Sequence, residues 1–150
     1  PYTRLVSAYD YLRKGGHPAW PGDEQFKEEV IGTYGEFDDF VLQWLRPEKS
    51  TFERPHFVPQ THFLRLNRRM AVDFIGSVET IEKDYGKLQE ELEDADPLRK
   101  KNAAPGDRKP PEAFYTNDEV IRRVQNVYRS DFEQLGYSLD VADANNPPEI

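Results

Sequence analysis

The fold of this chain is decided by its first nine residues, Pro1-Tyr2-Thr3-Arg4-Leu5-Val6-Ser7-Ala8-Tyr9. Proline has a fixed φ and no N–H, so Pro1 suits the entry to a helix. Apolar residues then recur at helical spacing and predict one buried stripe: Leu5, Tyr9 and Leu12. A second face carries a cation and two hydroxyls: Arg4, Ser7 and Tyr11. Because a helix N-terminus has unpaired N–H groups and partial positive charge, the segment predicts a helix able to hold an anion such as phosphate.

The composition predicts a polar domain with a moderate core. The chain has 150 residues, of which 37% are hydrophobic and 13% aromatic, enough to bury a core. Its 32% charged residues and 12 prolines predict long polar loops. The net charge of -8 argues against nucleic acid or an anionic membrane as a general partner. We therefore expect one domain, or part of one, that binds no nucleic acid.

Several kinds of site are excluded by what the sequence lacks. It has no cysteine, which excludes disulfides, zinc thiolate sites and cysteine nucleophiles. Its three histidines show no metal-ligand spacing with Asp or Glu, so we expect no metal. No phosphate loop ending in Gly-Lys-Ser/Thr occurs, and no apolar run approaches membrane-spanning length.

Periodicity and end signals predict the remaining elements. Helices are expected over residues 23–31, with Asp23 as N-cap, over residues 36–45, and from about residue 80. The last of these has an inward stripe of Ile81, Tyr85, Leu88 and Leu92. Residues 72–78 predict a short buried strand. The clearest helix opens at Thr116, where Glu119 completes a capping box, and ends at Gly136.

The opening segment closely resembles the 3′-phosphate-binding motif of sulfotransferases that use 3′-phosphoadenosine 5′-phosphosulfate (PAPS). The resemblance is to the family that contains the carbohydrate sulfotransferases and their bacterial relatives. Three later segments resemble that family in the same order: His56-x-x-Pro-Gln60, Asp73-Phe-Ile-Gly-x-x-Glu79, and Tyr115-Thr through Tyr128, Asp131-Phe132 and Gly136-Tyr137. The family motif starts with an Arg two residues before the proline, a position that this sequence does not contain.

This resemblance implies an α/β, P-loop-like sulfotransferase fold, present here as a mostly helical C-terminal fragment with one or two short strands. Residues 1–137 are then the C-terminal part of a single sulfotransferase domain, and residues 138–150 a flexible tail. The strand-loop-helix that cradles the 5′-phosphosulfate in the family is absent from this sequence. We therefore expect the fragment alone to be inactive.

The implied activity is transfer of a sulfuryl group from PAPS, as co-substrate, to an acceptor hydroxyl. The expected acceptor is a glycan, because the nearest resemblance is to the chondroitin, dermatan and heparan sulfotransferases, an argument from fold-level analogy. The absence of cysteine favours a bacterial, cytoplasmic protein over a Golgi-lumenal one. The question of a membrane anchor upstream of the fragment stays open.

The resemblance also implies site residues. Ser7 matches the motif serine that holds the 3′-phosphate, and Arg4 either reaches phosphate or supports the motif helix. A basic loop at residues 99–109 occupies the position of a late loop that closes over the nucleotide. Its candidate cofactor-binding residues are Asn102, Arg108 and Lys109.

The acceptor side has two candidates, His56 and Gln60, in the loop of residues 46–62. Each binds the acceptor or fixes the path of the loop, and His56 is also a weak candidate for the catalytic base. The resemblance alone does not identify the base, because the stretch in which some members carry a catalytic His lies outside this sequence.

Two other functions fit the residues. A nucleotide-dependent, kinase-like P-loop protein shares the architecture, but it needs a Gly-Lys-Ser/Thr loop upstream. A non-enzymatic helical interaction module needs only the amphipathic helices. Binding of the nucleotide 3′-phosphoadenosine 5′-phosphate separates the first interpretation from these two.

Overall fold

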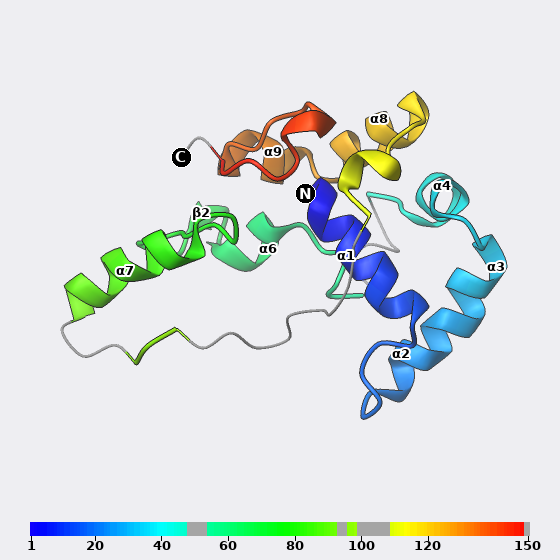
Figure 1. The fold of residues 1–150 in the computed structure, drawn as a ribbon, viewed down its shortest axis with the longest axis horizontal. Coiled ribbons are helices and arrows are strands. Elements are labelled where there is room, and N and C mark those ends of the chain that lie inside the picture. Colours follow the sequence, from blue (N-terminus) through cyan, green and yellow to red (C-terminus); the bar gives the residue numbers. More distant parts are fainter. Residues whose placement is uncertain (48–53, 93–95, 99–108, 149–150) are drawn as a thin grey trace.

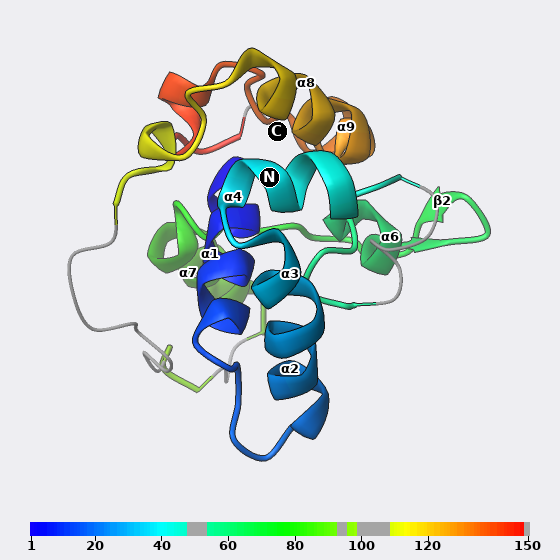
Figure 2. The same cartoon turned by 90° about the vertical axis from the view of Figure 1, so that its right-hand side faces the viewer.

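A computed structural model describes residues 1–47, 54–92, 96–98 and 109–148. The described residues are mostly helical, with one two-stranded hairpin, as the sequence predicts. Helix α1 (Tyr2–Arg13) runs through the middle of the molecule, and the other elements surround it (Figure 1, Figure 2). The first helix therefore organises the fold.

Helix α1 buries the predicted stripe. Leu5, Tyr9 and Leu12 are each at most 4% exposed. The buried face is wider than the stripe, since three more of its residues are buried: Tyr2, Val6 and Ala8. This width lets α1 contact helices on more than one side, which a helix on the surface of a domain does not do.

A second helical segment follows a Gly- and Pro-containing loop. It consists of α2 (Pro21–Phe26), a π-helical turn (Lys27–Ile31) and α3 (Gly32–Tyr34). The helix predicted for residues 23–31 is confirmed, but Asp23 is not its N-cap. Pro21 occupies the first turn instead, and Asp23 accepts a hydrogen bond from the His17 N–H at 3.1 Å, which closes the preceding loop.

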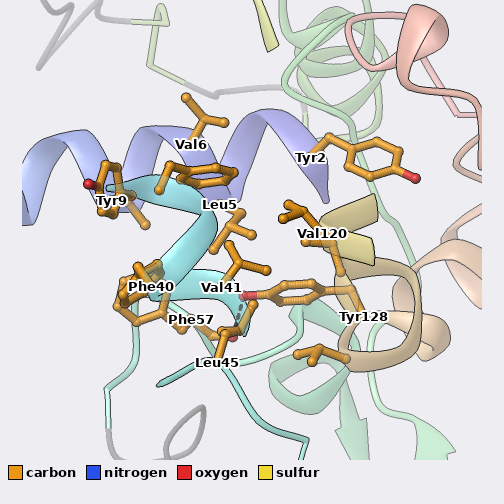
Figure 3. Close-up of a cluster of buried hydrophobic side chains, with 14 of the residues drawn as sticks. Tyr2, Leu5, Val6, Tyr9, Phe40, Val41, Leu45, Phe57, Val120 and Tyr128 are labelled. Carbon is orange, nitrogen blue, oxygen red and sulfur yellow. Dashed lines mark hydrogen bonds between the residues drawn. The ribbon is translucent and has the colours of Figure 1, made fainter. Parts of the chain in front are cut away.

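The helix predicted for residues 36–45 is confirmed as α4 (Phe37–Asp39) and a π-helical turn (Phe40–Trp44). Its aromatic residues interlock with those of neighbouring elements. Phe40 stacks on Trp44 with ring centroids 5.1 Å apart, and Trp44 meets Phe57 edge-on at 5.2 Å. Such pairs add about 0.5–1.5 kcal/mol each to the burial of their apolar area. Figure 3 shows this part of the core between α1 and Tyr128.

The C-terminal helix differs from its prediction at both its start and its middle. It begins as α8 (Asp118–Val127), and its N-cap is Asn117, whose side chain accepts from the Glu119 N–H at 2.9 Å. The prediction of a capping box with Thr116 as N-cap is therefore wrong, because Asn117, one residue later, caps the helix. Tyr128, with φ -103° and ψ 22°, interrupts the helix before α9 (Arg129–Leu135). Gly136, in the left-handed conformation at φ 68°, ends α9 as predicted.

The middle of the chain forms α6 (Gln60–Leu64), β1 (Arg65–Leu66) and β2 (Arg69–Met70). The two strands pair in antiparallel register, Arg65 with Met70 and Leu66 with Arg69. The strand predicted for residues 72–78 is wrong. No residue of this stretch is in a strand, and Val72, Phe74 and Val78 are 39%, 44% and 80% exposed. Apolar β-branched residues do not make a strand without a neighbour that pairs with their backbone.

Helix α7 (Ile81–Leu92) confirms the predicted helix but not its inward stripe. None of its residues is buried, and Ile81 and Leu92 are 45% and 59% exposed. Figure 1 shows α7 extending away from the helices around α1. The amphipathic pattern therefore predicted the helix correctly and its burial incorrectly.

The segment after α9 packs on α1, where the sequence predicts a tail. It contains the short 3₁₀ turn η4 (Val141–Asp143), which contacts a second 3₁₀ turn, η3 (Pro111–Ala113), that precedes α8. The Tyr2 hydroxyl donates to the Leu139 carbonyl at 2.8 Å, and the Thr3 hydroxyl to the Ala144 carbonyl at 2.8 Å. The described part of this segment, residues 138–148, thus lies against the start of α1.

Candidate functional site

A cavity of about 320 Å³ lies beside the first turns of α1, a volume within the range of small-molecule pockets. Four residues from one face of α1 line it: Thr3, Val6, Ser7 and Asp10. The opposite wall comes from two segments distant in sequence: Lys109, Pro110 and Pro111, and Asn145. The cavity is thus built where the start of the first helix meets the residues that precede and follow the last two helices.

Two residues expected to bind the nucleotide meet in this cavity. Ser7 comes from the middle of α1 and Lys109 from the end of the basic loop. The Lys109 side chain is exposed, so it can move toward an anion. The Ser7 hydroxyl and the Lys109 ammonium group supply hydrogen-bond donors and one positive charge for a phosphate. The residues present therefore fit the phosphate of a nucleotide.

One carboxylate also lines the cavity. Asp10 opposes an anion by charge, but its Oδ1 lies 3.2 Å from an Arg13 guanidinium nitrogen. This ion pair offsets part of the negative charge. The balance of charge in the cavity thus depends on Lys109, Arg13 and the helix dipole together.

Arg4 points to a different part of the molecule. Its Nη1 donates to the Val58 carbonyl at 2.7 Å and its Nη2 to the Pro55 carbonyl at 3.2 Å. Burial lowers the pKa of the Arg4 guanidinium, an effect that Tyr128 and Asp131 oppose. Arg4 therefore ties α1 to the loop before α6, and it is not among the residues that line the Ser7 cavity.

That loop is held by further side chains from the last two helices. The Tyr128 hydroxyl donates to the Phe57 carbonyl at 2.9 Å (Figure 3). Asp131, only 1% exposed, accepts from the Gln60 N–H at 2.8 Å, the Thr61 N–H at 2.9 Å and the Thr61 hydroxyl at 2.8 Å. The Asp131 carboxylate thus caps α6 from outside, because Gln60 is the first residue of that helix.

The anchored loop presents His56 and Gln60, which stay candidates for acceptor binding. The His56 ring lies 5.3 Å from the Tyr11 ring, and its Nε2 is 4.0 Å from Asp23 Oδ1. The Gln60 side chain is exposed. Neither residue lines the Ser7 cavity, so the candidate acceptor residues are separate from the residues that line that cavity.

The other sequence-based candidates, Asn102 and Arg108, lie outside the described residues. Sequence reasoning missed Thr3 and Asn145, which bring the C-terminal segment to the cavity. The Thr3 hydroxyl lies 3.3 Å from Asn145 Oδ1. The sequence contains one indication that the segment with Asn145 is ordered, namely Asp140. Its side chain caps the η4 turn by accepting from the Ala142 N–H at 2.9 Å. An aspartate directly before a short turn is a typical cap, because its side chain accepts from the N–H two residues later.

Metal ligation finds no support in the part of the chain that the structure describes. No group of three or more His, Asp or Glu side chains there could hold a metal ion. Within the same ranges, none of the helices has the length and apolar character needed to cross a membrane.

Comparison with known families identifies the chain. The model of the sulfotransferase family matches residues 1–138, which include α1, the loop before α6, and α8 and α9. The chain belongs to the sulfotransferase family. No curated protein and no solved structure matches it. The family supports sulfuryl transfer as the general activity of this sulfotransferase, and all four segments that carried the resemblance fall inside the match.

Two buried tyrosines brace the sulfotransferase core. The Tyr115 hydroxyl donates to the Tyr2 carbonyl at 3.0 Å, next to the cavity residue Thr3. Burial raises the pKa of Tyr115 well above its usual value, and burial likewise raises the pKa of Tyr128. Both hydroxyls therefore stay protonated and act as hydrogen-bond donors, one to α1 and one to the loop before α6.

Proposed function

We propose that this sulfotransferase transfers a sulfuryl group from PAPS to a hydroxyl of a glycan, and that the Ser7 cavity binds the 3′-phosphate of the nucleotide. We also propose that residues 1–137 form the C-terminal part of a P-loop-like α/β domain. When bound, PAPS supplies an activated sulfuryl group. The chain described here contributes phosphate binding and the loop that meets the acceptor.

The observation that carries the proposal is that Ser7 and Lys109 line one cavity. They come from the opening helix and from the end of the basic loop, two distant segments that the family resemblance assigns to nucleotide binding. Hydrogen bonds from neutral and cationic donors to a charged group contribute about 1.5–3 kcal/mol each. Two such donors on one phosphate are consistent with selective binding of a nucleotide that carries a 3′-phosphate.

The proposal for acceptor binding is based on the loop of residues 55–61. Arg4 and Tyr128 bind its carbonyl groups and Asp131 binds its N–H groups, so the backbone is held from both sides. A loop fixed in this way supports precise placement of the acceptor, which catalysis by orientation requires. We propose that His56 and Gln60 contact the acceptor sugar, and that His56 is the candidate for removing the hydroxyl proton.

The test is a transfer assay with the full-length protein that contains this chain. The assay follows labelled sulfuryl from PAPS onto a mixture of glycans, with ATP as the alternative donor of a phosphoryl group. We expect sulfuryl transfer, and a KM for PAPS that rises roughly tenfold or more in Ser7→Ala, because a hydrogen bond to phosphate is lost.

A matched control is Thr33→Ala, which removes an exposed hydroxyl that donates to the Glu29 carbonyl at 2.6 Å, away from the cavity. Its KM should equal that of the wild type. Phosphoryl transfer from ATP would support the kinase alternative, and absence of any transfer or nucleotide binding would support the interaction module.

A further inference from the structure

The β1–β2 hairpin concentrates positive charge in an acidic protein. Residues 65–70 contain three arginines whose side chains are all exposed: Arg65, Arg68 and Arg69. Their guanidinium groups form no ion pair with any residue that the structure describes. The whole chain has a net charge of -8. The hairpin therefore differs in sign from the chain as a whole, and Figure 2 shows it projecting away from α1, α8 and α9.

In the turn of the hairpin, one of these arginines has a positive φ, a backbone conformation that residues other than glycine rarely adopt. Asn67 and Arg68 have φ of 50° and 67°, the left-handed conformation that a two-residue hairpin turn of this type requires. Asparagine adopts it readily, but the second position favours glycine. Strained residues of this kind cluster at binding and catalytic sites. Arg68 thus occupies a position where glycine would fold more easily.

The strand register distributes charge and apolar surface over both faces of the hairpin. Arg65 pairs with Met70 and Leu66 with Arg69, and paired residues lie on the same face. Each face therefore has one guanidinium beside one exposed apolar side chain, and Arg68 lies at the turn. Phe63, in the last turn of α6, is 56% exposed. A surface that mixes cations with apolar side chains suits sugar rings that bear anionic groups.

The hairpin is also joined to the candidate acceptor loop. Helix α6 starts at Gln60 under the cap from Asp131 and leads directly into β1. The Ala71 N–H donates to the Leu64 carbonyl at 2.9 Å, which extends the pairing to the foot of the hairpin. A ligand held on the hairpin is thus held on the same unit as Gln60.

We propose that the hairpin of residues 65–70 binds the carboxylate or sulfate groups of an anionic glycan chain, the acceptor of this enzyme. The inference rests on the proposed function, because it takes the acceptor to be a glycan. Guanidinium groups pair with carboxylates and sulfates in forked hydrogen bonds. The acceptor is the anion that this site would meet, because α6 connects the hairpin directly to Gln60, a candidate for acceptor binding.

The experiment measures binding of a heparin oligosaccharide to the full-length protein by calorimetry, at low and at moderate salt. Replacing Arg65, Arg68 and Arg69 together by Ser should lower the affinity roughly tenfold, because three charged contacts are lost. Arg68→Gly should lower it roughly threefold. This second variant keeps the hairpin, because glycine accepts positive φ, so its loss of affinity is not caused by unfolding.

The matched control removes three other exposed arginines, Arg46, Arg122 and Arg129, again by Ser, with the same change in net charge. Its affinity for heparin should stay within about twofold of the wild type, since only diffuse attraction changes. Failure of the wild type to bind heparin, equal losses in the control, or RNA binding as tight as heparin binding would overturn the inference.

Titration of the same variants with 3′-phosphoadenosine 5′-phosphate distinguishes failure of the nucleotide proposal from failure of the hairpin proposal. Retained nucleotide binding in all variants, with heparin affinity that falls only in the hairpin variants, supports both proposals. Nucleotide binding with heparin affinity unaffected by the hairpin overturns the inference alone. Hairpin-dependent heparin binding by a wild type that binds no nucleotide overturns the nucleotide proposal alone.

Discussion

At the scale of single residues, Asp131 holds the end of the candidate acceptor loop from a distant helix, α9. Its carboxylate is buried and accepts three hydrogen bonds from Gln60 and Thr61. A buried carboxylate is stable only when donors satisfy it, and here the donors are the free N–H groups at the start of α6. The charge and the helix end therefore stabilise each other.

Asp131→Asn should destabilise the protein by about 3 kcal/mol, because an NH₂ group would face donors and leave them unpaired. The measurement is the free energy of unfolding in urea. The control is Glu133→Gln, an exposed residue of the same helix, where we expect a change within about 0.5 kcal/mol. Equal stability of Asp131→Asn and the wild type would contradict the assigned role.

At the same scale, the sequence points to some residues of the candidate site and not to others, for physical reasons. Ser7 was found because its neighbours make a recognisable motif, and the cavity brings it to Lys109. Asp131 belongs to a segment that resembles the family, but the sequence does not reveal its role as a cap. That role depends on a contact with a helix from a distant segment of the chain. The helix in question, α6, lies some seventy residues earlier in the chain.

At the scale of elements, the segment after α9 packs against α1, although the sequence predicts a flexible tail there. Asp140 starts a short turn, Ala144 is 9% exposed within the core, and two hydroxyls of α1 bind its backbone. It also brings Asn145 to the Ser7 cavity. The segment is therefore part of the candidate site.

Removing residues 139–150 should lower both stability and nucleotide affinity. The deletion takes away the carbonyl partners of the Tyr2 and Thr3 hydroxyls, and each lost hydrogen bond costs about 1 kcal/mol. We expect a lower urea midpoint and weaker binding of 3′-phosphoadenosine 5′-phosphate. A truncated protein with wild-type stability and affinity would mean that the segment has no role in either.

Elements whose apolar stripe meets other described residues were predicted well, and those without such a neighbour were not. The stripes of α1 and of residues 36–45 are buried as expected. The stretch 72–78 and the stripe of α7 carry equally apolar residues, yet none of these apolar residues is buried. Periodicity describes what an element is able to bury, whereas burial itself depends on which other segments reach it.

At the scale of the whole molecule, the protonation of buried tyrosines links stability to alkaline pH. Burial raises the pKa of Tyr115 and Tyr128, and burial with Glu79 nearby raises the pKa of Tyr137 to about 12. In the unfolded chain a tyrosine titrates near pH 10. Above that pH the unfolded state loses protons that the folded state retains, so the free energy of unfolding falls as pH rises.

We therefore expect stability to be constant with respect to these groups below pH 10 and to fall from about pH 10 to 12. Each fully buried tyrosine adds a slope of up to about 1.4 kcal/mol per pH unit. Urea unfolding across this range measures it, and Tyr137→Phe and Tyr128→Phe should each show a shallower decline. A decline of the same steepness in both variants would contradict the assignment.

The central claim is that the cavity between Ser7 and Lys109 recognises a 3′-phosphate. The most direct measurement compares, by calorimetry on the full-length protein, the affinities for 3′-phosphoadenosine 5′-phosphate and for adenosine 5′-phosphate, which lacks the 3′-phosphate. We expect the wild type to bind the first ligand more tightly, and Ser7→Ala to reduce this preference roughly tenfold by weakening binding of the first ligand alone. An equal effect of Ser7→Ala on both ligands, or no preference in the wild type, would contradict the claim.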